Sequence, residues 1–307
     1  MSSDPPVSVL LPTVSWTDAI DEIAGQLGAA DELLVICDAE TDPVAEALPA
    51  DDSVRLVVAG EPEGCSGKAN AIAAGMEAAS HDRFVWTDDD FEHSAGWLDR
   101  LREDYDDQGP TTELPFFAGR DPLSVLFEPL YTVAGTMGPY LGDIAWGGVV
   151  IFERDDLSEP ETFVDGMRRA LSDDGLLTDR TDITPVTRVR RVGVGGTIRE
   201  SLERHVRFTK ISRHYDPAAT AVNGVVGALT TVSGVLFPLP TVLVLTAVMA
   251  AVYAAFGLRR WTFLLAYPAV MVSIPLMLYG LARRTFVWGS RRYRWTGKLD
   301  VEVVGPA

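Results

Sequence analysis

Lysine is scarce in this sequence, whereas acidic residues are abundant. Only three of its 26 Lys and Arg residues are lysine, against 44 Asp and Glu, and the formal net charge is −18. A strongly negative chain does not offer the general basic surface that binds nucleic acid, so we expect no nucleic-acid partner. Abundant acid with little lysine indicates a halophilic, salt-adapted cytosol in which a hydrated acidic surface stays soluble. An ordinary acidic protein is the alternative.

Cysteine is equally scarce. Cys37 lies in an apolar run and Cys65 in a glycine-containing loop, and this spacing fits no metal site. We therefore expect two buried, idle thiols and no disulfide framework. The beginning of the chain, Met1–Pro6, is short and polar, which predicts no secretory signal and a cytoplasmic location for the first two-thirds.

Charge is almost absent between residues 218 and 282, where Arg259 and Arg260 are the exceptions. An uncharged stretch of this length is unusual for a buried core helix. It indicates a membrane segment, since about 20 apolar residues cross a bilayer. The stretch divides into three apolar runs: Ala221–Leu236, Thr241–Phe256 and Trp261–Ala282.

Basic residues flank the apolar stretch on both sides. The positive-inside rule places both clusters in the cytoplasm, which requires an even number of crossings. We therefore expect a multi-pass protein of the cell membrane with a cytoplasmic N-terminal part, two full crossings, and a re-entrant or interfacial remainder. The flanking residues are Arg199, Arg204, Arg207, Lys210 and Arg213 before the stretch, and Arg283, Arg284, Arg291, Arg292, Arg294 and Lys298 after it.

The part before the apolar stretch alternates between short apolar runs and segments with helical spacing. Fully apolar strands between helices predict an α/β fold with a mostly parallel sheet covered by helices on both faces. Such sheets bind ligands beyond the C-terminal ends of their strands. The predicted strands are 7–11, 33–37, 54–58 and 84–86, and the predicted helices are 17–27 and 69–79.

Three aspartates, Asp88, Asp89 and Asp90, follow the apolar strand 84–86. Adjacent carboxylates at a strand end are costly unless water, a donor or a metal satisfies them, and Mg²⁺ or Mn²⁺ suits such a cluster. Alternation along the strand would put Asp88 and Asp90 on one side and Asp89 on the other. This makes Asp89 the most replaceable of the three. An acidic surface turn is the alternative.

Other polar residues also lie at predicted strand ends. Thr13 follows the first strand, and Asp38 follows the second, where it can accept from a base or ribose donor or cap a turn. The loop Gly64–Asn70 leads into a helix and can place Lys68 near a phosphate, although its spacing is not that of a P-loop. An ordinary turn with a helix cap is the alternative.

Two pairs of charged residues come later in the chain. Asp173 and Asp174 lie beside apolar residues, where a carboxylate with a raised pKa could deprotonate a hydroxyl, or the pair could begin a helix. Arg204 and Arg207 share one face of a basic helix predicted near 198–213, with Phe208 at the membrane interface. The arginines either reach a phosphate or only flank the membrane segment.

Taken in order, these residues resemble family 2 glycosyltransferases with a GT-A fold, and most of all the membrane-bound branch that includes ceramide glucosyltransferases. That branch has an Asp after the second strand, a D-x-D, an acidic-Asp pair, and a (Q/R)-x-x-R-W motif before C-terminal membrane helices. Asp173 stands where Glu is usual. Phe208 stands where Trp is usual, which disfavours a processive polysaccharide synthase. The matching segments are Asp38, Asp88–Asp90, Asp173–Asp174 and Arg204–Phe208, together with Gly67–Ala71 and Ala145–Gly148.

The resemblance implies an inverting hexosyltransferase that moves a sugar from a nucleotide-diphosphate sugar to a lipid hydroxyl, in glycolipid synthesis, with Mg²⁺ or Mn²⁺. Asp174 is the expected catalytic base, and Asp88 and Asp90 are the expected metal ligands. Donor binding is expected from Thr13, Asp38, Lys68 and Asp88, and acceptor or diphosphate binding from Trp146, Asp173, Arg204, Arg207 and Phe208.

The composition and the resemblance together predict a domain layout, and they leave two alternatives for the function. We expect a GT-A catalytic domain at 1–215, a transmembrane region of two to three apolar helices at 216–285, and a basic, then acidic tail at 286–307. One alternative is a polyprenyl-phosphate sugar synthase, whose acceptor is already an anion and needs no base. The other is a non-catalytic membrane protein that binds a nucleotide sugar.

Overall fold

The computed structural model describes residues 5–48 and 51–307, and their contacts divide the chain into two compact units. The first unit holds the described residues up to Leu114, with 142–186 and 299–303, and the second holds 115–141, 187–298 and 304–307. The expected domain boundary near residue 215 stays a prediction. Residues 1–4, part of the polar beginning that predicts no secretory signal, lie outside the described residues.

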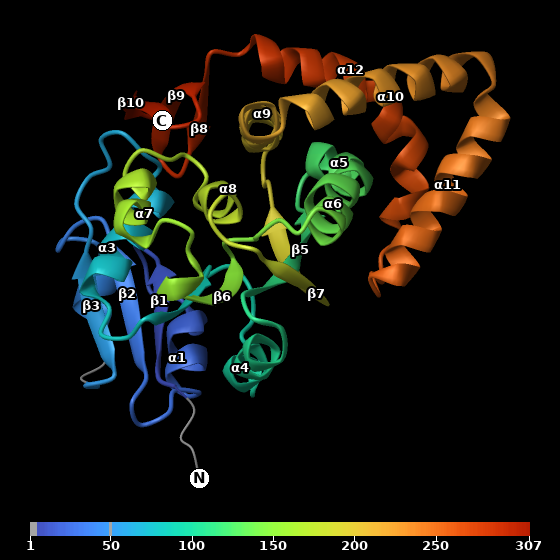
Figure 1. The fold of residues 1–307 in the computed structure, drawn as a ribbon. Coiled ribbons are helices and arrows are strands. Elements are labelled where there is room, and N and C mark those ends of the chain that lie inside the picture. The colour runs from blue at the N-terminus through green and yellow to red at the C-terminus, as the bar shows by residue number, and fades with distance from the viewer. Residues whose placement is uncertain (1–4, 49–50) are drawn as a thin grey trace. The chain divides into compact units, whose positions relative to one another are not determined.

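The sheet of the first unit begins with four parallel strands (Figure 1). Strand β1 lies between β2 and β4, β3 pairs with the other side of β2, and β6 runs antiparallel to β4. Each predicted strand is present to within one residue at either end, and the predicted mostly parallel α/β fold is confirmed. The strands are β1 (Val7–Pro12), β2 (Glu32–Cys37), β3 (Val54–Val58), β4 (Arg83–Thr87) and β6 (Val149–Glu153).

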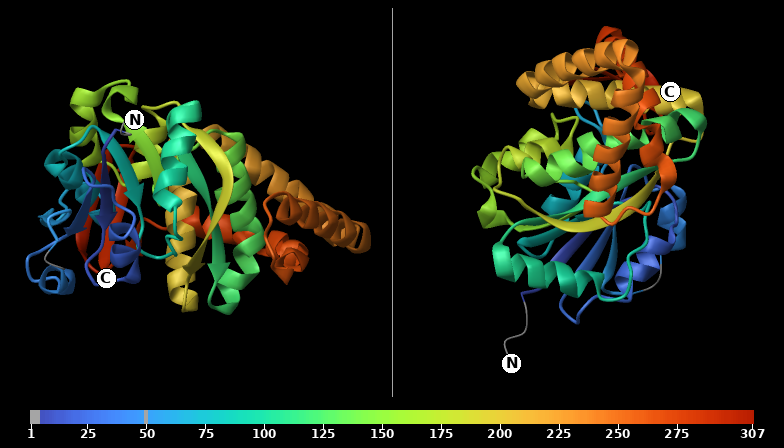
Figure 2. Two further views of the ribbon diagram at one scale, coloured as in Figure 1. Left: turned by 90° about the horizontal axis from the view of Figure 1, so that it is seen from below. Right: turned by 90° about the vertical axis from the view of Figure 1, so that its right-hand side faces the viewer.

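Side chains of these strands alternate between the two faces of the sheet. Leu10, Leu34 and Trp86 belong to one core cluster with residues of α3, α7 and α8. The intervening Val9 and Val85 point to the opposite face, which α1 and α4 cover (Figures 1 and 2). These helices are α1 (Asp18–Ala24), α3 (Gly67–Ala78), α4 (Trp97–Gln108), α7 (Pro160–Met167) and α8 (Asp173–Thr178).

Two strands, β5 (Thr111–Gly119) and β7 (Thr184–Val194), continue from the first unit into the second. They complete a sheet of order β3-β2-β1-β4-β6-β5-β7. Just beyond β5, the Arg120 N–H donates to the Val194 carbonyl at 2.9 Å.

The helices of the second unit include the three apolar runs. Three helices of the described residues are long and apolar enough to cross a membrane, and each matches one of the predicted runs, with Phe256 alone falling outside its helix. The basic helix expected near 198–213 is also present, and a capping box of Thr197 and Glu200 begins it. The helices are α5 (Pro122–Thr132), α9 (Ile198–Tyr215), α10 (Pro217–Leu236), α11 (Pro238–Ala255) and α12 (Ala266–Ala282), the last preceded by the 3₁₀ helix η3 (Trp261–Leu265).

The end of the chain has more structure than the sequence suggests. Strands β8 (Thr285–Trp288) and β9 (Arg291–Gly297) form an antiparallel hairpin, and β10 (Asp300–Pro306) completes a three-stranded sheet. The expectation of a basic, then acidic tail is correct in charge but missed these strands. Alternating charged and aromatic residues in β9, with Tyr293 and Trp295 buried, are the sequence signal that identifies them.

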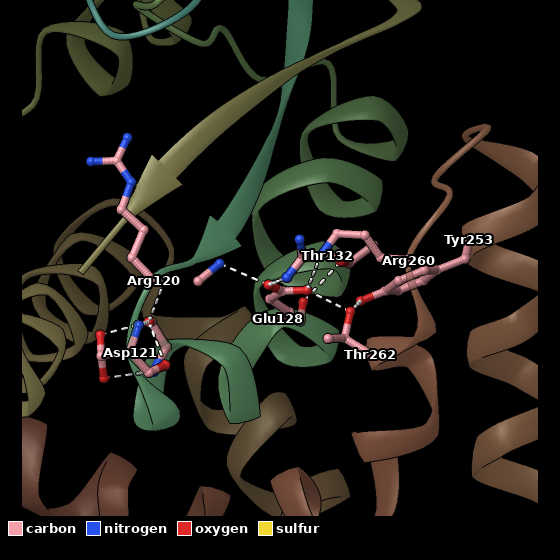
Figure 3. Close-up of polar contacts among 9 residues, drawn as sticks. Arg120, Asp121, Glu128, Thr132, Tyr253, Arg260 and Thr262 are labelled. Atoms are coloured by element: carbon pink, nitrogen blue, oxygen red, sulfur yellow. Dashed lines mark hydrogen bonds and ion pairs between the residues drawn. The ribbon is translucent and has the colours of Figure 1, made fainter. Parts of the chain in front are cut away.

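A buried carboxylate, Glu128 of α5, holds the connection between α11 and α12 (Figure 3). Its two oxygens accept from Arg260 at 2.6 and 2.9 Å. They also accept from the Thr262 hydroxyl at 2.5 Å and from the Gly119 N–H at 2.7 Å. Glu128 is fully buried, so its charge depends on these donors, and the charged pair fixes η3 to α5.

Removing the carboxylate charge should therefore destabilise the second unit. We expect Glu128→Gln to lower the free energy of unfolding by about 3 kcal/mol, because it leaves the Arg260 guanidinium without its counter-charge. Denaturant unfolding of the detergent-solubilised protein measures this. The control is Glu77→Gln, which removes the more exposed pair with Arg168 and should cost less than about 1 kcal/mol. Equal losses in the two variants would contradict the structural role of Glu128.

Candidate active site

The polar edge of the first unit lies beyond the C-terminal ends of β1 and β4. These strands are parallel neighbours, so the residues that follow them meet. The Thr13 hydroxyl donates to Asp89 Oδ2 at 2.6 Å, with the Ser15 carbonyl as an alternative acceptor at 2.8 Å. Strand β4 ends at Thr87, so strand alternation does not govern the aspartates, and Asp89 is held by Thr13. The expectation that Asp89 is the most replaceable of the three therefore finds no support in this geometry.

Lys68 connects the first aspartate of the triplet with the later acidic pair. Its Nζ lies 2.5 Å from Asp88 Oδ1 and 3.3 Å from Asp173 Oδ2. Lys68 lies in the first turn of α3, after the N-cap Ser66, and Asp173 begins α8 after the N-cap Ser172. Two ordinary helix beginnings thus bring together side chains that are more than a hundred residues apart.

The electrostatics of this group reflect burial and an excess of negative charge. Burial is the largest factor raising the pKa of Asp88, and Asp173 and Asp89 add to it against the opposing Lys68 ammonium. Burial would lower the pKa of Lys68, but Asp173 and Asp88 outweigh it and raise that pKa. Lys68 is therefore a permanent cation within the group.

Asp174 is the carboxylate whose pKa moves into the range of acid–base catalysis. Burial, and next the Asp173 carboxylate, raise the pKa of Asp174 to about 6, against hydrogen bonds from Ser172 and Gly175 and the charge of Lys68. The Gly175 N–H donates to Asp174 Oδ1 at 2.8 Å, and the Ser172 hydroxyl donates to the same oxygen. Such a group is ionised at neutral pH and still basic enough to take a proton.

The acidic group fits an additional cation. Lys68 is one positive charge facing three carboxylates, those of Asp88, Asp173 and Asp174. The buried Oδ2 of Asp173 makes no hydrogen bond. Its distance to the Lys68 ammonium, 3.3 Å, is longer than the 2.5 Å between Lys68 and Asp88. Across residues 5–48 and 51–307, no group of three or more His, Cys, Asp and Glu side chains is arranged to hold a metal ion. A cation here would therefore take further ligands from a bound phosphate or water.

Asp38 and the loop before α3 form the other side of this edge. Asp42 Oδ2 accepts from the backbone N–H groups of Asp38 and Ala39, each at 2.9 Å, and fixes the turn after β2. Asn70 of α3 donates to the Gly60 carbonyl at 2.8 Å, which fixes the segment after β3. Cys37 and Cys65 are both free and buried, as expected.

Gly147 belongs to the matching segment Ala145–Gly148, but the sequence motifs assign it no role. A Cβ at Gly147 would overlap Asp173 Oδ2 and lie 3.3 Å from Lys68 Nζ, so only glycine leaves room for this ion pair. The neighbouring Trp146 is 8% exposed and packs on Phe91 with ring centroids 5.7 Å apart. Little of its ring remains for a sugar, and the expected stacking stays a prediction.

Arg204, Arg207 and Phe208 lie in α9 of the second unit. The Arg204 guanidinium lies over the rings of Phe117 and Phe208, at 4.4 and 4.8 Å from their centroids. Arg207 lies over Trp288 at 4.1 Å. Phe208 is therefore part of an aromatic cluster that orients the two arginines. The presence of Phe where the family motif usually has Trp does not by itself reveal this role.

Comparison with known proteins supports the enzyme class. Residues 17–157 match the family model described as Glycosyl transferase family 2. This match supports a glycosyltransferase, as the motifs predict. It contains Asp38, Lys68, Asp88, Asp90 and Trp146, and ends before Asp173 and Asp174. No curated protein matches the chain.

Solved structures of similar shape are distant. One is titled only as a mycobacterial protein, at 21% identity and TM-score 0.43, covering 71% of this chain and 74% of that one. Glucosyl-3-phosphoglycerate synthase from Mycobacterium tuberculosis with phosphoglyceric acid has 21% identity and TM-score 0.42, covering 71% and 79%. The same enzyme with Mn²⁺ and UDP-glucose has 19% identity and TM-score 0.42, covering 67% and 79%. TM-scores below 0.5 support no conclusion about this chain.

The close approach at Gly147 gives a test of the acidic group. We expect Gly147→Ala to lower the free energy of unfolding by about 1–3 kcal/mol, because Asp173 and Lys68 must move apart in a packed site. The matched control is Gly64→Ala, whose Cβ would make an ordinary contact 3.5 Å from the Arg168 carbonyl. Denaturant unfolding compares the two, and an unchanged Gly147→Ala protein would contradict the predicted overlap.

Proposed function

We propose that this protein is a membrane-associated inverting glycosyltransferase that moves a sugar from a nucleotide-diphosphate sugar to a hydroxyl of a lipid acceptor. The observation that carries the proposal is Asp174, a carboxylate with its pKa raised to about 6 beside the ion-paired Lys68, Asp88 and Asp173. An acceptor hydroxyl needs a base, and a carboxylate with this pKa is one that works at neutral pH.

The donor is proposed to lie along the edge formed by β1, β2 and β4. Asp38 would accept from the base, and Asp88 from the ribose. Thr13 keeps Asp89 in place, and Lys68 keeps Asp88 and Asp173 in place. Asp88 and Asp90 would hold a divalent cation, Mg²⁺ or Mn²⁺, which when bound neutralises charge on the leaving diphosphate.

The transfer step itself needs one proton acceptor. Asp174 takes the proton of the acceptor hydroxyl while the hydroxyl oxygen forms a bond to the anomeric carbon. The bond from that carbon to the diphosphate oxygen breaks, and the nucleoside diphosphate leaves with the electron pair. Attack from the face opposite the diphosphate inverts the anomeric configuration.

The second unit is proposed to supply the lipid side. The three apolar helices are long enough for membrane attachment. Arg204 and Arg207 are held over aromatic rings that restrict their conformations, and we propose that they bind an anionic headgroup. Membership of the ceramide-glucosyltransferase-like branch is part of this proposal and rests on the ordered motifs.

Asp174→Asn tests the base. We expect it to lower the rate of transfer at least a hundredfold while donor binding changes less than threefold, because the amide keeps the shape but accepts no proton. Donor binding is measured by calorimetry and transfer by product formation. The control is Asp179→Asn, at the end of the same helix α8. Transfer at the normal rate in Asp174→Asn would remove Asp174 from this role.

The pH dependence follows from the same pKa. Asp174 is a base only when it is deprotonated, so transfer should be constant above about pH 7 and fall about tenfold per pH unit well below pH 6. The measurement is kcat/KM from pH 4.5 to 8.5 under conditions in which the protein stays folded. A rate that rises as the pH falls would contradict a carboxylate base.

A donor and acceptor screen tests the function as a whole. Membranes containing the protein are incubated with a panel of labelled nucleotide sugars, and the lipids are extracted. A labelled lipid with a glycosidic bond to a hydroxyl supports the proposal, and Asp174→Asn membranes give the background. Label on a polyprenyl phosphate would show the alternative synthase, and donor binding without turnover a non-catalytic protein.

A further inference from the structure

Helix α12 is attached to polar elements of the second unit at both of its ends. At its beginning, η3 is bound to Glu128 of α5 through Arg260 and Thr262. Close to its end, Gly280 packs so tightly on Thr209 of α9 that a Cβ would come within 2.6 Å of the threonine hydroxyl. Directly after it, Arg283 pairs with Glu203 of α9 at 3.0 Å.

Helices α5 and α9, which carry these contacts, lie side by side. The Ser201 hydroxyl donates to Asp121, at the beginning of α5, at 2.6 Å. Further along the same two helices, the rings of Phe127 and His205 lie 5.4 Å apart. The two helices thus form one layer, and α12 begins on one member of this layer and ends on the other.

The α5–α9 layer is too highly charged to enter a bilayer. Helix α9 alone has seven charged side chains, and each would cost about 2.5–3.5 kcal/mol at the bilayer centre. They are Arg199, Glu200, Glu203, Arg204, Arg207, Lys210 and Arg213. A helix fixed at both ends to this layer cannot have one end on each side of a membrane, so α12 does not cross.

Helix α10 runs antiparallel along α12 and packs against it at both ends. The Thr231 hydroxyl donates to the Val270 carbonyl at 3.2 Å, and the Tyr267 hydroxyl donates to the Gly234 carbonyl at 3.3 Å. At the other end of the pair, a Cβ on Gly224 would lie 3.1 Å from Met277. Glycines thus form the α10 face toward α12, and α10 accompanies α12 without crossing.

Helix α11 connects the end of α10 with η3, and both of these are held on the side of the α5–α9 layer. It begins directly after α10 and ends at Ala255, before the turn held by Glu128. Met249 and Tyr253, in its second half, pack with Phe116 and Ala118 of β5. A single crossing by α11 would require its ends to lie on opposite sides, which the contacts of α10 and η3 forbid.

We propose that the apolar segment 217–282 is a monotopic anchor that lies in one leaflet of the membrane and does not cross it. This replaces the two full crossings expected from the sequence and rests on the proposed membrane attachment. Its inner side is the α5–α9 layer, and its outer side is formed by α10 and by α11 as far as Val248.

The outer side has the composition of a lipid-facing surface. Large apolar side chains of α10 recur at helical spacing and continue into α11, all at least half exposed. The surrounding unit is basic, since residues 187–298 contain 16 of the 26 Lys and Arg but three of the 44 Asp and Glu. An anionic bilayer therefore complements both properties. The outer residues are Val222, Val225, Val226, Leu229, Val232, Val235, Leu236, Leu239, Leu243, Val244 and Val248.

Depth measurements with spin labels test the proposal on the full chain. Single cysteines replace Leu229, Leu239 and Val248, and the protein is bound to sealed vesicles of anionic phospholipid. The buried Cys37 and Cys65 give the background in the unchanged chain, and Asp155→Cys, exposed in the first unit, gives the value for water. Collision with oxygen and with a nickel chelate gives the depth of each label, without any sugar donor.

An in-plane anchor predicts similar shallow depths for the three labels, about 5–10 Å below the headgroups of the outer leaflet. A nickel chelate trapped inside the vesicles should reach none of them. The proposal fails if the Leu229 label lies near the bilayer centre, about 15 Å deep, and trapped chelate reaches the Leu239 label. It also fails if all labels stay in water, as in a lipid-free dimer. Because depth needs no turnover, loss of transfer activity does not affect these outcomes.

Discussion

The ion pair of Lys68 with Asp88 and Asp173 is the interaction on which the acidic site depends. Carboxylates repel one another in a buried setting, and each would be driven toward its neutral form without a cation nearby. One ammonium, 2.5 Å from Asp88 and 3.3 Å from Asp173, pairs with two of them. Its charge also opposes the rise in the pKa of the third, Asp174. The base stays available because its pKa rises only to about 6, and Gly147 preserves the space that this arrangement needs.

Charge is also the organising constraint in the second unit. Glu128 is buried among its donors, and α9 presents a row of charged side chains that must remain near water. The three apolar helices lie between α9 and the C-terminal strands in the sequence. The outer side chains of α10 and α11 are exposed and do not pack against the rest of the unit. A layer of polar helices with an apolar layer fixed on it is the arrangement on which the proposed in-plane membrane anchor rests.

Much of the first unit could be predicted from the sequence, because its signals are local. Apolar runs of four to six residues between helices located β1 to β4, and the ordered acidic motifs located the candidate site. Sequence patterns say less where local rules do not apply. Strand alternation does not extend to Asp89, which lies beyond the end of β4. Charge alone does not reveal the sheet formed by residues 285–306, in which Tyr293 and Trp295 are buried.

The sequence by itself determined the parallel sheet, the acidic strand ends and the three apolar helices, since side-chain periodicity and charge spacing are properties of neighbouring residues. Only the tertiary structure decided that Asp88 and Asp173 share Lys68 and that Thr13 holds Asp89. It also decided that α12 is fixed at both ends to one polar layer. Such contacts join residues that are far apart in the chain, and their partners are selected by strand pairing and helix packing, which local patterns do not encode.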